Sequence, residues 1–466
     1  MITLYPDQEL WIGGLRDAFS AGYHSPLGVL PTGGGKTVCF SYLTSRLVTA
    51  GKRVCLMVHR DELVEQISKT LARFEVRHGL ITAGTLYDRR LLAHVASVMT
   101  LARRLDRVAV PDYVIIDEAH HGAAATWQKI IAAWRKANPK LRVIGVTATP
   151  ELLSGEGLGV MFDEMVLGLS TRELIELGRL SPYRLFAPSQ AVDLSGVHMQ
   201  AGDFNRKELG AALDKPAIVG SAVGEYTKLL NGAPAVAFCV SVEHANHVAE
   251  NFRAAGFRSM CIDGKMDKSL RRDLVRDFSN GQLNVLTSCE IVSEGFDIPG
   301  IVGAILLRPT WSLAMYLQQV GRALRTAPGK EAAVICDHVG NSGRHGMPDD
   351  PRSWSLLGRE ERRGKKKDED NVAVRQCQSC YAVSPAAASK CRECGAPFPV
   401  KSRQIEEISG TLSEVEVAKA RRQAARDQAA AATLEDLIRL GTARGYSNPV
   451  GWAKHLIHAR QQKGVA

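Results

Sequence analysis

A run of small residues, PTGGGKT at positions 31–37, constrains the fold of this chain more than any other feature. It follows the apolar segment Gly28–Leu30 and opens a helical pattern that stops near Gly51. Such a strand–loop–helix unit gathers backbone N–H groups at a helix N-terminus, where they can bind a phosphate. The general pattern has a glycine five residues before Gly35, where this chain has Leu30, so a glycine-rich turn without a ligand stays an alternative.

Short apolar strands alternate with amphipathic helices in two stretches, the pattern of parallel sheets covered by helices. The strands expected in the first stretch are 28–30, 54–58, 113–116 and 141–146, and in the second 235–240, 259–262, 284–287, 301–307 and 332–337. Pro182 disfavours helix at Ser181, which places the joint there. We therefore expect an α/β fold with tandem domains at 1–182 and 183–345.

The strand–helix pattern stops near Gly358, where the charge run GREERRGKKKDEDN begins. We expect a charged linker at 346–373, a cysteine module at 374–400 and a helical, basic C-terminal segment at 401–466, with helix from about 406 to 440. Residues 351–466 hold 21 Lys+Arg against 13 Asp+Glu, so +8 of the net charge of +10 lies in this last quarter. That excess suits a polyanionic partner, although a solvated charged surface has the same composition.

Four of the ten cysteines are clustered in two CxxC pairs, Cys377/Cys380 and Cys391/Cys394. Two such turns let four thiolates surround one metal ion tetrahedrally, so the spacing predicts a small zinc ribbon. Chance cysteines or disulfides are the alternative, although disulfides are rare in reducing compartments. The other six are scattered and are expected to be buried thiols, namely Cys39, Cys55, Cys239, Cys261, Cys289 and Cys336.

An acidic pair ends one of the expected strands. Tyr113–Ile116 runs into Asp117-Glu118-Ala119-His120. An aspartate at the carboxyl end of a parallel strand faces the same crevice as the phosphate loop. Asp117 can therefore hold Mg²⁺, and Glu118 can orient and activate a water molecule.

This DEAH string resembles motif II of the superfamily 2 helicases and translocases. Further strings resemble the other motifs in family order, namely LYPDQ at 4–8, VHRDELVEQ at 58–66, VASVMTLARRL at 95–105, TATP at 147–150, EGFDIP at 294–299 and QQVGRALR at 318–325. The resemblance spans residues 1–345 and implies two tandem RecA-like domains with one ATP site between them. Within the family, LLRPT, QQVGRALR, DHVGN and the cysteine pairs are most similar to RadD-type bacterial repair helicases and their phage relatives.

The resemblance also implies a role for each residue in these motifs. Those expected to bind ATP are Gln8, Thr32, Gly33, Gly34, Gly35, Lys36, Thr37, Gly295 and Asp297, with Thr37 and Asp117 on Mg²⁺. Glu118, Arg322 and Arg325 are the expected catalytic residues, the two arginines acting from the second domain. Arg60, Thr100 and Thr287 are expected to contact a nucleic-acid strand through its phosphates. Tyr5 stands where related enzymes often have arginine.

These residues together predict an ATP-dependent DNA helicase or translocase that uses ATP, Mg²⁺ and Zn²⁺, in repair or in phage replication. The expected partner is DNA, single-stranded or branched, with a repair or replication protein as a second partner. An RNA helicase, the motor subunit of a restriction system, and a non-catalytic zinc-dependent nucleic-acid-binding protein stay open as alternatives.

The sequence also bears on location. No apolar run reaches the ~18 residues that a membrane span needs. Met1–Trp11 lacks the basic and then apolar pattern of a secretory signal. We expect no membrane partner and a cytoplasmic location.

Overall fold

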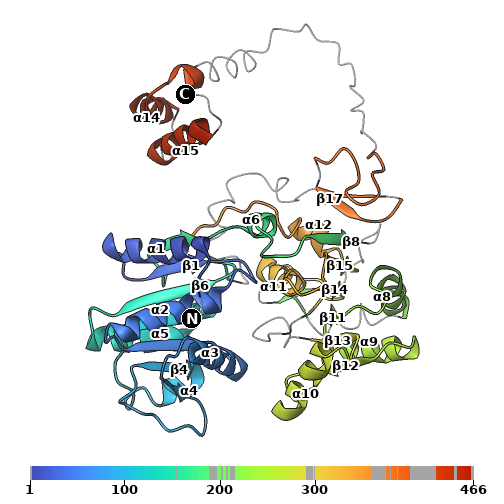
Figure 1. The fold of residues 1–466 in the computed structure, drawn as a ribbon, viewed down its shortest axis with the longest axis horizontal. Coiled ribbons are helices and arrows are strands. Elements are labelled where there is room, and N and C mark those ends of the chain that lie inside the picture. Colours follow the sequence, from blue (N-terminus) through green and yellow to red (C-terminus); the bar gives the residue numbers. More distant parts are fainter. Residues whose placement is uncertain are drawn as a thin grey trace. The chain divides into compact units, whose positions relative to one another are not determined.

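The structure is a computed structural model of the 466-residue chain. It describes residues 3–152, 156–187, 197–200, 203–205, 208–209, 216–289, 298, 300–357, 374–377, 379–385, 387–398, 427–444 and 449–462. The chain divides into two compact units, Met1–Pro399 and Val400–Ala466, which are described separately (Figure 1).

Seven parallel strands form the first sheet, in the order β3-β4-β2-β5-β6-β1-β7. They are β1 (Pro26–Val29), β2 (Val54–Val58), β3 (His78–Ile81), β4 (Ala93–Ser97), β5 (Tyr113–Asp117), β6 (Arg142–Thr147) and β7 (Glu164–Leu167). The helices of this lobe are α1 (Pro6–Ser20), α2 (Lys36–Thr49), α3 (Asp61–Arg73), α4 (Val98–Arg103) and α5 (Ala125–Ala137), with a 3-10 helix at Ala119–Ala123. Successive strand residues face opposite sides, so Leu56 and Met57 enter different cores.

Six parallel strands form the second sheet, in the order β12-β13-β11-β14-β15-β8. They are β8 (Tyr183–Phe186), β11 (Ala235–Phe238), β12 (Ser259–Ile262), β13 (Val285–Ser288), β14 (Gly303–Leu306) and β15 (Ala333–Asp337). The helices are α8 (Pro216–Leu229), α9 (Val242–Ala254), α10 (Lys268–Ser279), α11 (Leu313–Ala323) and α12 (Asn341–His345). Two parallel-sheet domains in tandem confirm the predicted α/β fold.

Four strands of the two large sheets were absent from the sequence-based expectation: β3, β4, β7 and β8. Three of them, β3, β7 and β8, lie at sheet edges, where a strand is buried on fewer sides and its residues are only partly apolar. A short mixed stretch such as His78–Ile81 carries little periodic signal for a strand.

Residues 346–357 lie in the stretch expected to be a linker, and they touch both lobes. The Tyr183 hydroxyl in β8 donates to Asp349, whereas the Gly159 N–H of the first lobe donates to the Leu356 carbonyl at 2.8 Å. Trp354 and Leu356 pack against the core beneath the first sheet. This segment therefore tethers one lobe to the other. Residues 358–373, with most of the charge run, lie outside the described residues.

The cysteine module is built on the hairpin of β16 (Val374–Gln376) and β17 (Val383–Pro385). It packs on β8, the edge strand of the second sheet. Phe186 forms a bridge with Ala382, the Ala187 N–H donates to the Tyr381 carbonyl at 3.4 Å, and Arg184 pairs with Glu393 at 2.5 Å. The buried side chains of Cys377, Ala382, Cys391 and Phe398 share one core with Phe186. The module is therefore part of the second lobe's hydrophobic core.

The second unit contains two helices, α14 (Leu434–Ala443) and α15 (Pro449–Gln462). The Thr433 hydroxyl caps α14 by accepting from the Asp436 N–H at 3.2 Å. Leu437 and Ala453 are buried between the two helices. The helix expected from 406 lies outside the described residues as far as 426. In the part of the chain that is described, no helix has the length and apolar character needed to cross a membrane.

Gly28 in β1 tests the packing of α1 on the first sheet. A Cβ atom at Gly28 would lie 2.2 Å from Cζ2 of the buried Trp11, so Gly28→Ala should lower the free energy of unfolding by about 1–3 kcal/mol through overpacking. The matched control is Gly13→Ala inside α1, where nothing lies within 4 Å of the added carbon. Urea unfolding should show it to be neutral or up to about 1 kcal/mol more stable. Equal effects of the two substitutions would contradict this packing.

Candidate functional site

The loop between β1 and α2 is shaped by its glycines. Gly33 and Gly35 both have φ of +87°, the left-handed region that other residues rarely adopt. A Cβ on Gly35 would also lie 2.4 Å from Gln8 Nε2. The Lys36 ammonium group donates to the Leu30 carbonyl at 3.3 Å, while the Leu30 side chain is buried in the core. Leu30 thus serves the loop through its backbone, which explains how the chain tolerates a leucine at this position.

Gln8 of α1 holds the loop from the other side. Its Oε1 accepts from the Tyr5 N–H at 3.1 Å, and its Nε2 donates to the Gly34 carbonyl at 3.3 Å. The side chain is buried. Gln8 therefore links the segment LYPDQ directly to the loop between β1 and α2.

Two carboxylates meet the loop at the carboxyl end of β5. Asp117 is buried, and its Oδ1 accepts from the Glu118 N–H at 3.0 Å. Glu118 has a φ of +50°, a strained value for a glutamate and one that turns the chain sharply after the strand. Burial and then the Glu118 carboxylate raise the pKa of Asp117 to about 7, although Lys36 opposes the shift. Burial likewise lowers the pKa of Lys36, against the pull of both carboxylates.

Such a buried acidic group fits a divalent cation. Mg²⁺ bound there would favour the ionised carboxylate and neutralise charge on the phosphates, with Thr37 and Asp117 as the residues that would hold it. The loop N–H groups and Lys36 supply the remaining positive potential.

The second lobe completes the cavity with α11. A cavity of about 280 Å³ is lined by residues of both lobes, among them Thr32, Gly33, Gly35, Lys36, Thr37, Asp117, Glu118, Gln318, Arg322 and Arg325. The lobes touch here, because a Cβ on Gly321 would lie 2.6 Å from Thr32 Cβ. Most of the expected nucleotide and catalytic residues are therefore brought together. Gly295 and Asp297 lie outside the described residues.

Arg179 lines the same cavity, and sequence reasoning missed it. Its guanidinium lies 3.7 Å above the centre of the Tyr5 ring and forms an ion pair with Asp7. No local pattern could reveal an arginine so distant in sequence from its partners. It supplies a cation at the place where Tyr5 replaces the arginine of related enzymes.

Three histidine rings in contact, the histidine cluster His59, His120 and His121, connect the segments expected to bind nucleic acid and ATP. The His121 ring lies 4.1 Å from the His59 ring and 4.3 Å from the His120 ring, between ring centres. His120 Nδ1 is 3.6 Å from Glu118 Oε2 and 3.3 Å from Thr147 Oγ1. The strings VHRDELVEQ, DEAH and TATP are thus in direct contact. His121, which directly follows DEAH, is the sequence feature that could have pointed to this cluster.

The three residues expected to touch nucleic acid differ in exposure. Arg60 precedes α3 and Thr100 lies in α4, and both are half-buried at the ends of the neighbouring strands β2 and β4. Thr287 is fully buried in β13, and its hydroxyl donates to the Ala245 carbonyl at 2.7 Å. The side chain of Thr287 cannot reach a strand in this structure, so any contact would have to come from the backbone at the end of β13.

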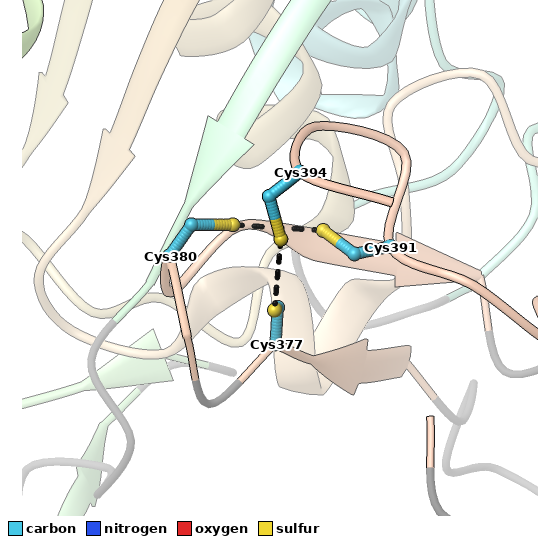
Figure 2. Close-up of side chains that lie close together, drawn as sticks. All are labelled: Cys377, Cys380, Cys391 and Cys394. Atoms are coloured by element: carbon cyan, nitrogen blue, oxygen red, sulfur yellow. Dashed lines mark hydrogen bonds between the residues drawn. The ribbon is translucent and has the colours of Figure 1, made fainter. Parts of the chain in front are cut away.

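The four clustered cysteines fit a metal ion. All four sulfur atoms lie within 4.8 Å of one another, and the Sγ–Sγ distances are 3.5 Å for Cys377–Cys394 and for Cys380–Cys391 (Figure 2). Thiolates bind zinc at about 2.3 Å, so tetrahedral sulfurs lie roughly 3.8 Å apart.

The pKa values of the cysteines also fit a metal ion. The Cys380 N–H lowers the pKa of Cys377 to about 6, whereas burial raises the pKa of Cys380 to about 12. Deprotonation of a second cysteine of the cluster is therefore unfavourable unless a cation offsets the negative charge. The four cysteines are compatible with Zn²⁺ as that cation.

Known proteins match this chain over both lobes. Residues 1–152 match the family model "Type III restriction enzyme, res subunit", and residues 219–327 match "Helicase conserved C-terminal domain". A "51.5 kDa protein" of a Lactococcus phage is 36% identical over 378 residues, which are 80% of this chain and 78% of the phage protein.

Two further relatives are less similar. The "Putative ATP-dependent helicase IRC3" of Saccharomyces cerevisiae is 30% identical over 67% of this chain, which spans about half (48%) of the yeast protein. The fragment structure of a putative HsdR subunit of a type I restriction enzyme from Vibrio vulnificus has a TM-score of 0.59 at 20% identity, covering 73% of this chain and 65% of that one. The last likeness supports the fold alone.

Glu118→Gln tests the acidic pair. The substitution keeps the loop and Asp117, so it should retain ATP binding while the hydrolysis rate falls about 10²–10⁴-fold, the usual contribution of a general base. Lys36→Ala should lose both binding and turnover, because it removes the point charge at the loop. Lys52→Ala, on an exposed turn, is the control and should match the unmodified protein. Steady-state ATPase assays and calorimetric ATP binding measure both; normal turnover by Glu118→Gln would disprove its role.

The cysteine cluster should hold one zinc per chain. The double substitution Cys391→Ser, Cys394→Ser should abolish zinc binding and lower the melting temperature of the second lobe, because the cluster shares a core with β8. Cys289→Ser, outside the cluster, should keep the metal. Elemental analysis and thermal melts test both points. A purified wild-type protein without zinc would rule out the metal site.

Proposed function

The chain belongs to the superfamily 2 helicases, the ATP-hydrolysing motors of nucleic acid, and we propose that it is a DNA helicase or translocase. The observation that carries this proposal is the cavity built from both lobes. Lys36 and the acidic pair come from the first lobe, and Arg322 and Arg325 come from the second. Hydrolysis needs both sets, so a change in how the lobes meet can switch it on or off.

Each charged residue has a part in this proposal. Lys36 holds the terminal phosphates, Glu118 orients and deprotonates the attacking water, and Arg322 and Arg325 stabilise the charge that develops as the phosphate bond breaks. An arginine acting in this way is worth about 10³–10⁵ in rate. Arg322→Ala should therefore affect turnover far more than nucleotide binding.

The histidine cluster offers a route by which a bound strand could speed hydrolysis. Arg60 adjoins His59, and at the other end of the cluster His120 Nδ1 lies 3.6 Å from the Glu118 carboxylate. A strand that fixes Arg60 would also fix the position of Glu118 through packed rings. Nucleic acid would then stimulate the ATPase by favouring one arrangement of the site.

DNA is the proposed substrate. The likeness of the motifs and cysteine pairs to RadD-type repair helicases supports it and suggests a role in repair or replication. The similarity to a protein of a Lactococcus phage is compatible with a phage setting for that role. The basic last quarter of the chain supplies charge for phosphates. A repair or replication protein is the proposed second partner.

The same features of the sequence and the cavity bear on three alternative functions. The match of residues 1–152 to the family model "Type III restriction enzyme, res subunit" favours a restriction-system motor, which would act with a partner nuclease. An RNA helicase has the same two-lobed fold. A non-catalytic zinc-dependent nucleic-acid-binding protein is the weakest alternative, since it would have no need for Lys36, Asp117, Glu118 and Arg322 around one cavity.

Parallel ATPase assays discriminate among these functions. Single-stranded DNA or a DNA fork should raise the hydrolysis rate more than RNA of the same length and salt concentration. Displacement of streptavidin from a biotinylated strand should then report movement, and Arg322→Ala should be inactive in both assays. Stimulation by RNA alone would establish the RNA helicase instead. A rate that no nucleic acid changes would reject the motor altogether.

A further inference from the structure

One tryptophan stands out on the second lobe. Trp311 lies in the loop between β14 and α11, and 47% of it is exposed. The ring of Phe204, which is itself buried, lies behind it with 6.0 Å between ring centres. Large exposed aromatic rings are costly in water and are typical of binding surfaces.

The backbone of this loop is held by the partly buried Asp203 and the buried Asn341. Asp203 accepts from the Trp311 N–H at 2.8 Å and from the Thr310 hydroxyl at 3.0 Å, and it lies 3.7 Å from the Arg308 guanidinium. Asn341 adds a second pair of bonds, accepting from the Thr310 N–H at 3.0 Å and donating to the Arg308 carbonyl at 2.9 Å.

Asn341 is fixed in turn by Asp337 at the end of β15. The Asp337 carboxylate accepts from the Asn341 N–H at 3.0 Å and from the N–H and hydroxyl of Ser342. Thr310, Asp337, Asn341 and Ser342 are all buried. The segments LLRPT and DHVGN are therefore joined by a network of hydrogen bonds. The exposed indole ring of Trp311 follows directly after this network. A ring carried on a backbone held in this way is well suited to recognition, because the loop has little conformational entropy left to lose on binding.

The topology places this ring at the edge of the lobe where strands end. β11, β13 and β14 are parallel neighbours, with Phe238 opposite both Ser288 and Leu306. Their carboxyl ends, and the loop that carries Trp311, therefore share one edge of the sheet. It is the edge at which the end of β13 was expected to meet the nucleic-acid strand.

We propose that Trp311, backed by Phe204, is a stacking platform for an unpaired base of the bound strand. This inference rests on the proposed function, since it presumes a strand across the lobes. Stacking on an aromatic ring tolerates any base, so it adds affinity without sequence preference. It also complements phosphate contacts, which hold the backbone but leave the bases unbound.

An abasic oligonucleotide separates stacking from charge. Binding of a thymidine oligonucleotide and of an abasic one of equal length is measured by fluorescence anisotropy. Trp311→Ala should weaken binding of the thymidine oligonucleotide by about 5- to 150-fold and leave binding of the abasic one unchanged. Trp311→Phe should keep most of the affinity, and the salt dependence of binding should stay the same, because no phosphate contact is lost.

The control is Tyr23→Ala, at an exposed ring before the amino end of β1, which should change neither affinity. If Trp311→Ala lost affinity equally for both oligonucleotides, or lost none for either while the wild type binds both, the stacking role of Trp311 would be wrong. The proposed helicase function would not be affected by that result. A wild type that binds no nucleic acid would instead reject the proposed function together with the platform.

Discussion

The rest of the structure depends on a cluster of buried and half-buried charged groups at the meeting point of the two lobes. Lys36, Asp117 and Glu118 approach from one sheet, and Arg322 and Arg325 from the other. Charges removed from water are unfavourable unless opposite charges surround them. The cluster holds three basic and two acidic groups, so a polyphosphate would offset its excess of positive charge. If the proposed function holds, a bound nucleotide would therefore favour contact between the two lobes.

Contacts away from the cavity limit how the lobes can separate. Arg271 of α10 pairs with Glu62 of α3 at 2.9 Å, and Lys268 lies 3.3 Å from Asp61 beside it. Both acidic residues lie directly after Arg60, so these ion pairs join the second lobe to a segment expected to touch the strand. On the other side, the segment 346–357 crosses between the lobes. Motion is therefore confined to a few contacts that can break and re-form, as hinge and shear movements require.

The sequence predicted most of the inner strands and most of the charged residues of the cavity, because buried parallel strands and phosphate loops have strong local patterns. Asp117 at a strand end and Gly35 before a helix are fixed by local geometry. It did not predict Arg179 or the burial of Thr287, since both depend on neighbours brought together only by folding. The sequence did not point to Trp311 either. A binding role for a single tryptophan in a loop can be inferred only once the structure shows that Asp203 and Asn341 hold that loop in place.

The packing of the cysteine module on β8 bears on how the protein is made. β8 begins at Tyr183, yet it pairs with β15, which ends at Asp337, and its outer side is covered by residues up to Phe398. The strands of the first sheet all lie between Pro26 and Leu167. During synthesis the first sheet can assemble early, whereas the second must wait for nearly the whole of this unit to leave the ribosome. Until the module arrives, the nascent chain carries an uncovered strand edge, the kind of surface that chaperones bind and that pairs wrongly with other chains.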